Sequence, residues 1–140
     1  MSTLTMTVKD AMDRKIVTAD GKTSAFDALN LMIKNKVWSV VVTEKGKYVG
    51  IVTERDIIRR CIARGLDCKT VPVEKLMSSP LFTIEAHRSP GDAMQMMMDK
   101  GVRRLFVTEN GKIIGRITNV ELMEKTLEVF KALHASISSL

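Results

Sequence analysis

The segment GIVTERD, residues 50–56, sets the pattern of this chain, and a looser copy, GRITNVE, follows 65 positions later at residues 115–121. In both copies an apolar run typical of a β-strand meets a threonine and then a helical pattern. A threonine followed three residues later by an acid has the spacing of a capping box, in which the hydroxyl and the carboxylate each accept a backbone N–H at a helix start. Capping alone would explain both residue types.

A second interpretation of the same segment is a ligand site. Gly50 and Gly115 lie three residues before the threonines, where a missing Cβ lets another group approach the backbone. A helix N-terminus also offers unpaired N–H groups and the positive end of a dipole, which suit a phosphate. Because the arrangement occurs twice in register, we favour ligand contact over capping alone for Thr53 and Asp56.

The repetition extends well beyond these segments. Residues 8–57 align with residues 73–122 without a gap and with fifteen identities in fifty positions, which indicates internal duplication. We place the first repeat, with an N-terminal helical turn, at residues 1–70 and the second, with an extended C-terminal helix, at residues 71–140. One repeat alone would leave much of its apolar surface wet, so we expect the two to pack through their sheets.

Each repeat has the same predicted order of elements: helical turn, strand, helix, two strands and helix. In the first repeat the predicted elements are a turn at 8–12, an extended segment at 15–18, a helix opened by Ser24, strands at 37–43 and 48–52, and a helix at 54–64 ended by Gly65. In the second they are a turn at 73–77, an extended segment at 81–83, a helix opened by Ser89, strands at 105–107 and 113–117, and a helix at 119–134. The last helix carries a longer apolar stripe than one repeat can bury, so we expect a second chain to cover it.

Composition places the chain among globular proteins, with 140 residues, 45% hydrophobic and 27% charged. No apolar run approaches the roughly 20 residues needed to span a bilayer, and residues 1–6 lack the pattern of a signal peptide. Cys61 and Cys68 form neither a disulfide framework nor a metal-ligand spacing. We therefore expect a cytoplasmic protein in a reducing compartment, with no membrane partner.

The net charge of +6 and pI of about 9.5 favour anionic partners. The lysines and arginines are scattered, with no run of five, and aromatic residues make up 4% of the chain, so a nucleic-acid partner is disfavoured. The sequence shows no Ser/His/Asp arrangement, metal-ligand cluster or Walker-type loop, and we expect no enzymatic activity.

Taken together, this ordered pattern resembles the cystathionine β-synthase (CBS) domain, and two in tandem resemble a CBS pair, or Bateman module, over residues 8–125. The resemblance implies an α/β fold of two βαββα repeats packed through their sheets, with pseudo-two-fold symmetry and two clefts. Members bind AMP, ADP, ATP or S-adenosylmethionine as regulatory ligands, for example in energy sensing, and often form flat homodimers. Most are fused to an enzyme, channel or transporter. These 140 residues leave no room for one, so we expect a stand-alone module with no required cofactor and an unidentified protein target.

The resemblance also implies roles for residues of the first repeat. Asp56 would hold the ribose hydroxyls through its two carboxylate oxygens, and Thr53 would contact ribose or phosphate with Arg55 beside it. Thr18 would meet the adenine edge, and Gly50 would keep the approach open. The other positions of this implied site are Ile16, Val17, Val37, Ser39 and Val40.

In the second repeat the equivalent positions of the implied site are Thr83, Val102, Leu105, Gly115 and Thr118. Arg103 and Arg104 occupy positions where the family often binds phosphate, to which a guanidinium fork is suited. A solvated pair of charges is the equal alternative for these two arginines. The implied clefts lie between the repeats, so one site can combine Asp56 with either arginine. Glu121 stands where the family has aspartate, and its extra methylene would misplace its oxygens against a ribose. We therefore expect one competent site, at Asp56, and one that is weak or empty.

Three functions from different classes remain open from the sequence. The first is an adenosine-ligand sensor that signals through its shape or its dimer packing. The second is a structural dimerisation module whose clefts have degenerated. The third is a nucleic-acid-associated protein that uses the positive net charge.

Overall fold

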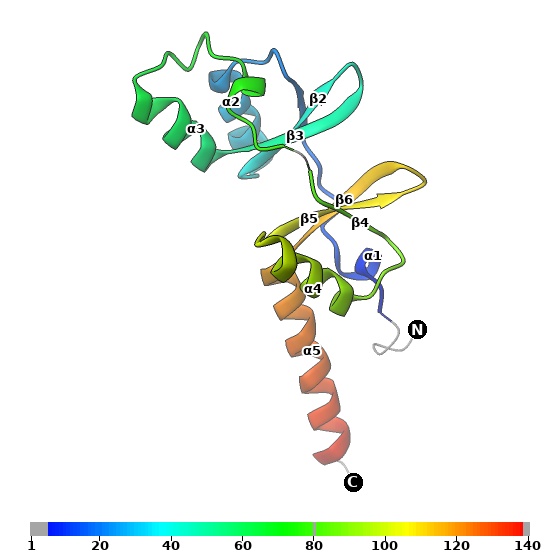
Figure 1. The fold of residues 1–140 in the computed structure, drawn as a ribbon. Coiled ribbons are helices and arrows are strands. Elements are labelled where there is room, and N and C mark those ends of the chain that lie inside the picture. The colour runs from blue at the N-terminus through cyan, green and yellow to red at the C-terminus, as the bar shows by residue number, and fades with distance from the viewer. Residues whose placement is uncertain (1–5, 80, 139–140) are drawn as a thin grey trace. The chain divides into compact units, whose positions relative to one another are not determined.

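The computed structural model describes residues 6–79 and 81–138. Residues 1–5, which include most of the segment searched for a signal peptide, lie outside the described residues. The chain is an α/β protein with two three-stranded sheets, each accompanied by helices (Figure 1). The predicted fold class of two βαββα repeats is therefore confirmed.

The chain divides into two compact units that do not coincide with the two sequence repeats. One unit is Ile16–Leu81, here called the first-repeat unit. The other joins the described parts of Met1–Lys15 and Phe82–Leu140, and is called the second-repeat unit. The helical turn that precedes each repeat in sequence thus belongs to the unit built around the other repeat.

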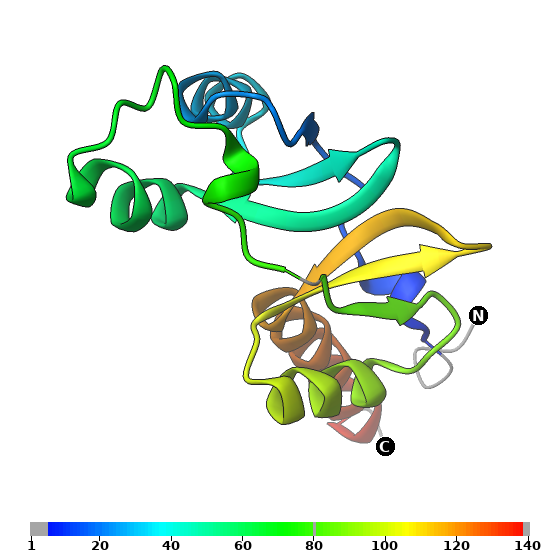
Figure 2. The ribbon, with the colours of Figure 1, turned by 45° about the horizontal axis from the view of Figure 1, so that its top comes forward.

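In the first-repeat unit the sheet has the strand order β1-β2-β3, with β1 parallel and β3 antiparallel to β2 (Figure 2). Its elements are β1 (Thr18–Asp20), α2 (Ala25–Asn35), β2 (Ser39–Glu44), β3 (Lys47–Thr53), α3 (Glu54–Arg60), and the 3-10 turns η2 (Ile62–Arg64) and η3 (Val73–Lys75). Its core joins residues of α2, β2 and α3, and includes Val73 from η3.

The second-repeat unit has the equivalent order, β4-β5-β6, with the same strand directions. Its elements are α1 (Val8–Ala11), β4 (Thr83–Glu85), α4 (Pro90–Lys100), β5 (Arg104–Glu109), β6 (Lys112–Thr118) and α5 (Asn119–Ser138). Val8 and Ala11 of α1 contribute to its core, as Val73 does to the other.

Local sequence explains where these elements begin and turn. Ser24 Oγ accepts the amide of Asp27 at 3.1 Å to start α2, and Ser89 Oγ accepts that of Asp92 at 3.0 Å to start α4. Each β-hairpin turns through two residues with positive φ, which the favoured two-residue turn requires. These are Lys45 and Gly46 in one unit, and Asn110 and Gly111 in the other.

Several predicted boundaries are wrong. The first strand of each repeat begins at Thr18 or Thr83, where those threonines were expected to end it, because Ala19 and Ile84 are the residues buried in the core. Helix α3 ends at Arg60 with Cys61 as its C-cap, and the 3-10 turn η2 follows before Gly65. Helix α5 continues to Ser138, four residues beyond the predicted end.

Candidate functional site

The residues predicted for the first site converge on one end of the first-repeat sheet. In the strand register Thr18 pairs with Val41, and Ser39 pairs with Thr53. The beginnings of β1 and β2 therefore lie beside the end of β3, where α3 starts. The second unit repeats this arrangement, because Arg104 pairs with Thr118.

Asp56 and Thr53 form the predicted capping box. Thr53 N donates to Asp56 Oδ2 at 2.9 Å, and Asp56 N donates to Thr53 Oγ1 at 3.1 Å. The other carboxylate oxygen, Oδ1, lies 4.0 Å from Arg60 Nε, which is too long for a hydrogen bond. The Asp56 side chain is 16% exposed, so it lies at the edge of the surface with one oxygen committed to the backbone.

The amides of the two helix starts are largely used within the protein. In α3, Glu54 N donates to Trp38 O at 3.1 Å, and Asp56 N is taken by the cap. In α5, Asn119 N donates to Arg103 O and Glu121 N donates to Thr118 Oγ1. An anion at either helix start would depend on side chains more than on these backbone groups.

The two site glycines do not leave the backbone open to a ligand, contrary to expectation. A Cβ on Gly50 would lie 2.7 Å from both Met77 Sδ and Ser78 O. Ile51 and Ser78 exchange backbone hydrogen bonds of 3.0 and 2.8 Å, which hold this segment against β3. The backbone at Ser78 therefore occupies the space beside Gly50 in which a ligand was expected.

The same closure occurs at Gly115 in the second-repeat unit. A Cβ there would lie 2.5 Å from Met12 Sδ and 2.7 Å from Asp13 O. Asp13 and Arg116 exchange backbone hydrogen bonds of 2.8 Å in each direction, and Arg116 Nη2 lies 3.4 Å from Asp13 Oδ2. Both glycines therefore allow a chain segment to pack closely against the strand. In each unit this is the segment that follows the helical turn contributed from outside the repeat, η3 or α1.

The remaining predicted residues divide between core and surface. Val37, Ser39, Val40 and Leu105 are buried, and Val40 and Leu105 are 0% exposed. The half-buried positions are Ile16, Val17, Val102 and Arg104. The exposed positions are Thr18, Arg55, Thr83 and Arg103. Polar groups at the sheet ends are therefore accessible, while much of the predicted apolar wall belongs to the core.

Glu121 caps α5 with a different distribution of oxygens. Thr118 N and Thr118 Oγ1 both donate to Glu121 Oε1, at 3.2 and 3.0 Å. Burial raises the pKa of this carboxyl above its ordinary value, and the hydrogen bonds from Thr118 offset the rise only in part. The neighbouring carboxylate of Asp13 adds to the rise, whereas Arg116 opposes it.

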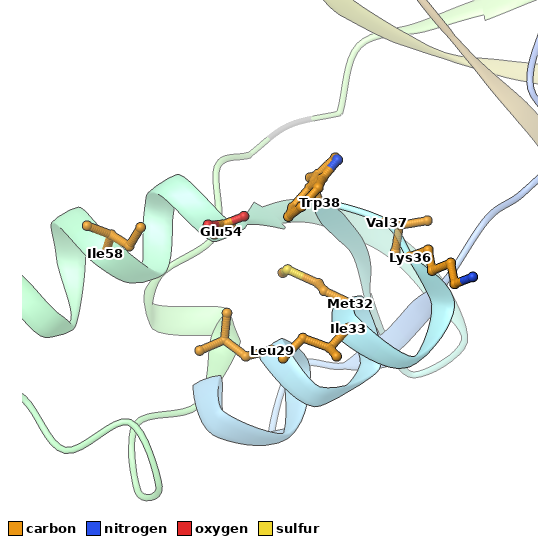
Figure 3. Close-up of a pocket in the computed structure, with 8 residues that line it drawn as sticks. All are labelled: Leu29, Met32, Ile33, Lys36, Val37, Trp38, Glu54 and Ile58. Carbon is orange, nitrogen blue, oxygen red and sulfur yellow. The ribbon is translucent and has the colours of Figure 1, made fainter.

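A hydrophobic groove of about 510 Å³ lies between α2 and α3 (Figure 3). It is lined by Leu29, Met32, Ile33, Lys36, Val37, Trp38, Glu54 and Ile58. Trp38 is 69% exposed and Ile33 is 74% exposed, so two large apolar side chains are open to solvent beside it. No local feature of the sequence around Trp38 indicates this exposure.

Exposed hydrophobic side chains recur at equivalent positions of the two units. Each pair below is separated by the 65 residues that relate the repeats. The pairs are Ile33 with Met98, Ile58 with Met123, and Ile62 with Leu127. Both units therefore present an apolar face on the helices that follow their first and third strands.

The described part of the chain holds no group of three or more His, Cys, Asp or Glu side chains placed to bind a metal ion. Within residues 6–79 and 81–138, no helix combines the length and apolar character that crossing a bilayer requires.

The family model for the CBS domain matches residues 8–63 and 73–128. This chain therefore belongs to the CBS-domain family and carries two CBS domains in tandem. The CBS domain-containing protein YhcV of Bacillus subtilis is 33% identical over 108 residues, covering 77% of this chain and 76% of that protein. An uncharacterized protein of Methanopyrus kandleri is 32% identical over 121 residues, and the match covers 85% of this chain and 62% of that relative's length.

Solved structures show the same fold. A CBS-domain protein from Burkholderia ambifaria has a TM-score of 0.79 and 27% identity, covering 88% of this chain and 95% of that one. A hexameric CBS-CP12 protein from bloom-forming cyanobacteria has a TM-score of 0.77 and 25% identity, covering 86% of this chain and 67% of that one.

Proposed function

We propose that this CBS pair is a non-catalytic regulatory module that binds an adenosine-containing ligand, such as AMP, ADP, ATP or S-adenosylmethionine. The site lies at the end of the first-repeat sheet, with Asp56 as the ribose anchor. The observation that carries the proposal is the convergence of Thr18, Ser39 and Thr53 on the strand ends where α3 begins.

The geometry of Asp56 supports this assignment. Its Oδ2 is engaged with Thr53 N, which fixes the carboxylate, whereas Oδ1 has a distant cation, Arg60, as its neighbour. A fixed carboxylate with a spare oxygen suits a sugar hydroxyl, because little ordering is left to do on binding. Arg55, exposed in the first turn of α3, is the nearest candidate in sequence for a phosphate contact.

We further propose that two copies of the chain associate through the exposed apolar helix faces. The groove between α2 and α3, with Trp38 at its edge, supplies one such face, and the equivalent residues of α4 and α5 supply another. Ligand occupancy at the start of α3 is then coupled to association, because Glu54 and Ile58 of the same helix line the groove.

Thermal unfolding with each of the four ligands tests the proposal, with Asp56→Asn and Glu121→Gln as a matched pair. A ligand at 100 times its Kd should add about 2.7 kcal/mol to the free energy of unfolding. Asp56→Asn should lose this gain while keeping the cap through its amide oxygen, and Glu121→Gln should retain it. Absence of any shift in the wild type, or an undiminished shift in Asp56→Asn, contradicts the assignment.

Sedimentation tests the association separately. Trp38→Ala should weaken self-association without changing the ligand-induced stabilisation of the isolated chain. A wild type that stays monomeric at every accessible concentration would leave these faces to another protein.

A further inference from the structure

We infer that Cys61 and Cys68 form a reversible redox pair, a modification site that closes a disulfide within the first-repeat unit. Both are free cysteines, and their sulfur atoms lie 3.1 Å apart. That separation is about 1 Å longer than a disulfide bond, so small side-chain rotations suffice to join them. The proposal is independent of the ligand site described above.

The backbone around the pair is already held in a closed loop. Leu66 N donates to Cys61 O at 3.0 Å, and Cys61 Sγ lies 3.6 Å from Leu66 O. Gly65, with φ of 72°, reverses the chain after η2. Cys68 O accepts the amide of Phe26 at 2.9 Å, which fixes the far end of the loop against the start of α2. The hydrogen bonds donated by Leu66 N and Phe26 N, which do not involve sulfur, thus help to hold the two thiols facing each other.

A metal site does not explain this pair. Two thiolates supply half of the ligands of a structural zinc site, and the described residues provide no third His, Cys, Asp or Glu in position. The chemistry left to two adjacent thiols is oxidation to a disulfide.

Burial assigns different roles to the two cysteines. Cys61 is 0% exposed, whereas Cys68 is half-buried and is the one that an outside reagent can reach. Burial, together with the adjacent Cys68 thiol, raises the pKa of Cys61 to about 11, which keeps it protonated and unreactive toward solvent. Cys68 is thus the attacking thiol and Cys61 the resolving thiol.

The oxidant is a low-molecular-weight disulfide such as oxidised glutathione. The Cys68 thiolate attacks one of its sulfurs, forms a mixed disulfide and releases one thiolate. Cys61 then attacks Cys68 Sγ and passes its proton to the departing second thiolate, which leaves as a thiol. The protein loses two electrons and two protons, and the small disulfide is reduced to two thiols.

Closing the bond links Cys61, at the end of α3, to the loop residue Cys68, whose carbonyl oxygen accepts the amide of Phe26 at the start of α2. The loop is short, and its closure should raise the unfolding temperature of the first-repeat unit by roughly 10–20 °C. The second-repeat unit contains no cysteine and should not respond.

The test is a titration of the full chain with mixtures of reduced and oxidised glutathione, followed by alkylation and peptide mapping. The wild type should form one intramolecular Cys61–Cys68 bond, independent of protein concentration and reversed by dithiothreitol. Cys61→Ala should accumulate glutathione on Cys68, while Cys68→Ala should stay unmodified because Cys61 is buried.

The proposal is overturned if the most oxidising mixture yields no such bond, or if cross-links between chains form in its place. Equal glutathione labelling of the two variants would overturn the assigned roles. Should the variants fail to fold, the wild-type titration and its reversal decide the matter alone.

Discussion

The starts of α3 and α5 solve the same capping problem with acids of different length. Asp56 meets the Thr53 amide with one oxygen and keeps the other near Arg60. Glu121 accepts hydrogen bonds from both the amide and the hydroxyl of Thr118 with one oxygen, Oε1. The comparison teaches that a capping motif can be preserved while the groups left over for a ligand change.

The two units are more alike where the helical turns pack, η3 in the first-repeat unit and α1 in the second-repeat unit. Val73 N donates to Thr23 O at 2.8 Å in one unit, and Val8 N donates to Arg88 O at 2.8 Å in the other. An ion pair follows in both, Lys22 with Glu74 at 2.7 Å and Lys9 with Glu109 at 3.0 Å. The units are thus equivalent in architecture and differ at the candidate site.

The largest expected effect tests the architectural equivalence. Gly50→Ala and Gly115→Ala each place a Cβ within 2.7 Å of a backbone oxygen, that of Ser78 or Asp13. Each should lower the free energy of unfolding by roughly 2–3 kcal/mol, because backbone must move. Chemical denaturation measures this. Gly91→Ala is the control, since its Cβ would come no nearer than 3.7 Å to Ser89 Oγ, and it should be close to neutral.

The next effect tests the difference between the two helix starts. Glu121→Asp shortens the acid of the second repeat to that of the first. If side-chain length decides whether the second-repeat site binds a ligand, calorimetry should show a second adenosine-ligand site per chain. A ligand at 100 times its Kd should then add up to about 2.7 kcal/mol more to the free energy of unfolding. Unchanged stoichiometry would show that the surroundings, including Asp13 and Arg116, decide competence.

A third prediction concerns how α2 and α4 end. Lys36 occupies a left-handed conformation with φ of 55°, whereas α4 ends at Gly101 with φ of 65°. Lys36→Gly should therefore raise the free energy of unfolding by about 1 kcal/mol, and Gly101→Lys should lower it by a similar amount. Equal and opposite shifts in thermal melts are expected; a destabilising Lys36→Gly would reveal a role for the lysine side chain.

The smallest effect concerns pH. Because the folded-state pKa of Glu121 is raised, its contribution to stability is present below the unfolded pKa and is lost as pH rises through the folded value. Glu121→Gln should remove that loss, measured by denaturation from about pH 4 to about pH 7. Asp92 gives the opposite sign, since Arg88 and the Ser89 amide lower its pKa, and its contribution is lost as pH falls.

Much of the fold could be predicted from local sequence. The repeat is visible in the alignment, the serine and threonine caps depend on residues a few positions apart, and these predictions are confirmed. The exchange of helical turns could not be predicted in this way. Residues 8–12 carry an apolar pattern that fits either sheet, and only tertiary packing selects one.

The candidate site shows the same limit. Sequence identified Gly50 as a position of close approach, but could not distinguish a ligand from the segment at Ser78. It dismissed Cys61 and Cys68 by counting cysteines, although their meeting depends on the reversal at Gly65 and the hydrogen bond from Phe26. The ligand roles of Thr18, Asp56 and the two arginines stay predictions.

The crossed helical turns also bear on how such a chain could arise. In a polypeptide with one repeat, the helical turn would not pack on the sheet of its own repeat. Two such polypeptides would have to associate and exchange their turns. Gene duplication places both repeats in one chain, so the exchange of helical turns becomes intramolecular and no longer depends on protein concentration. Severing the chain between the repeats should therefore give fragments that recover structure only when mixed.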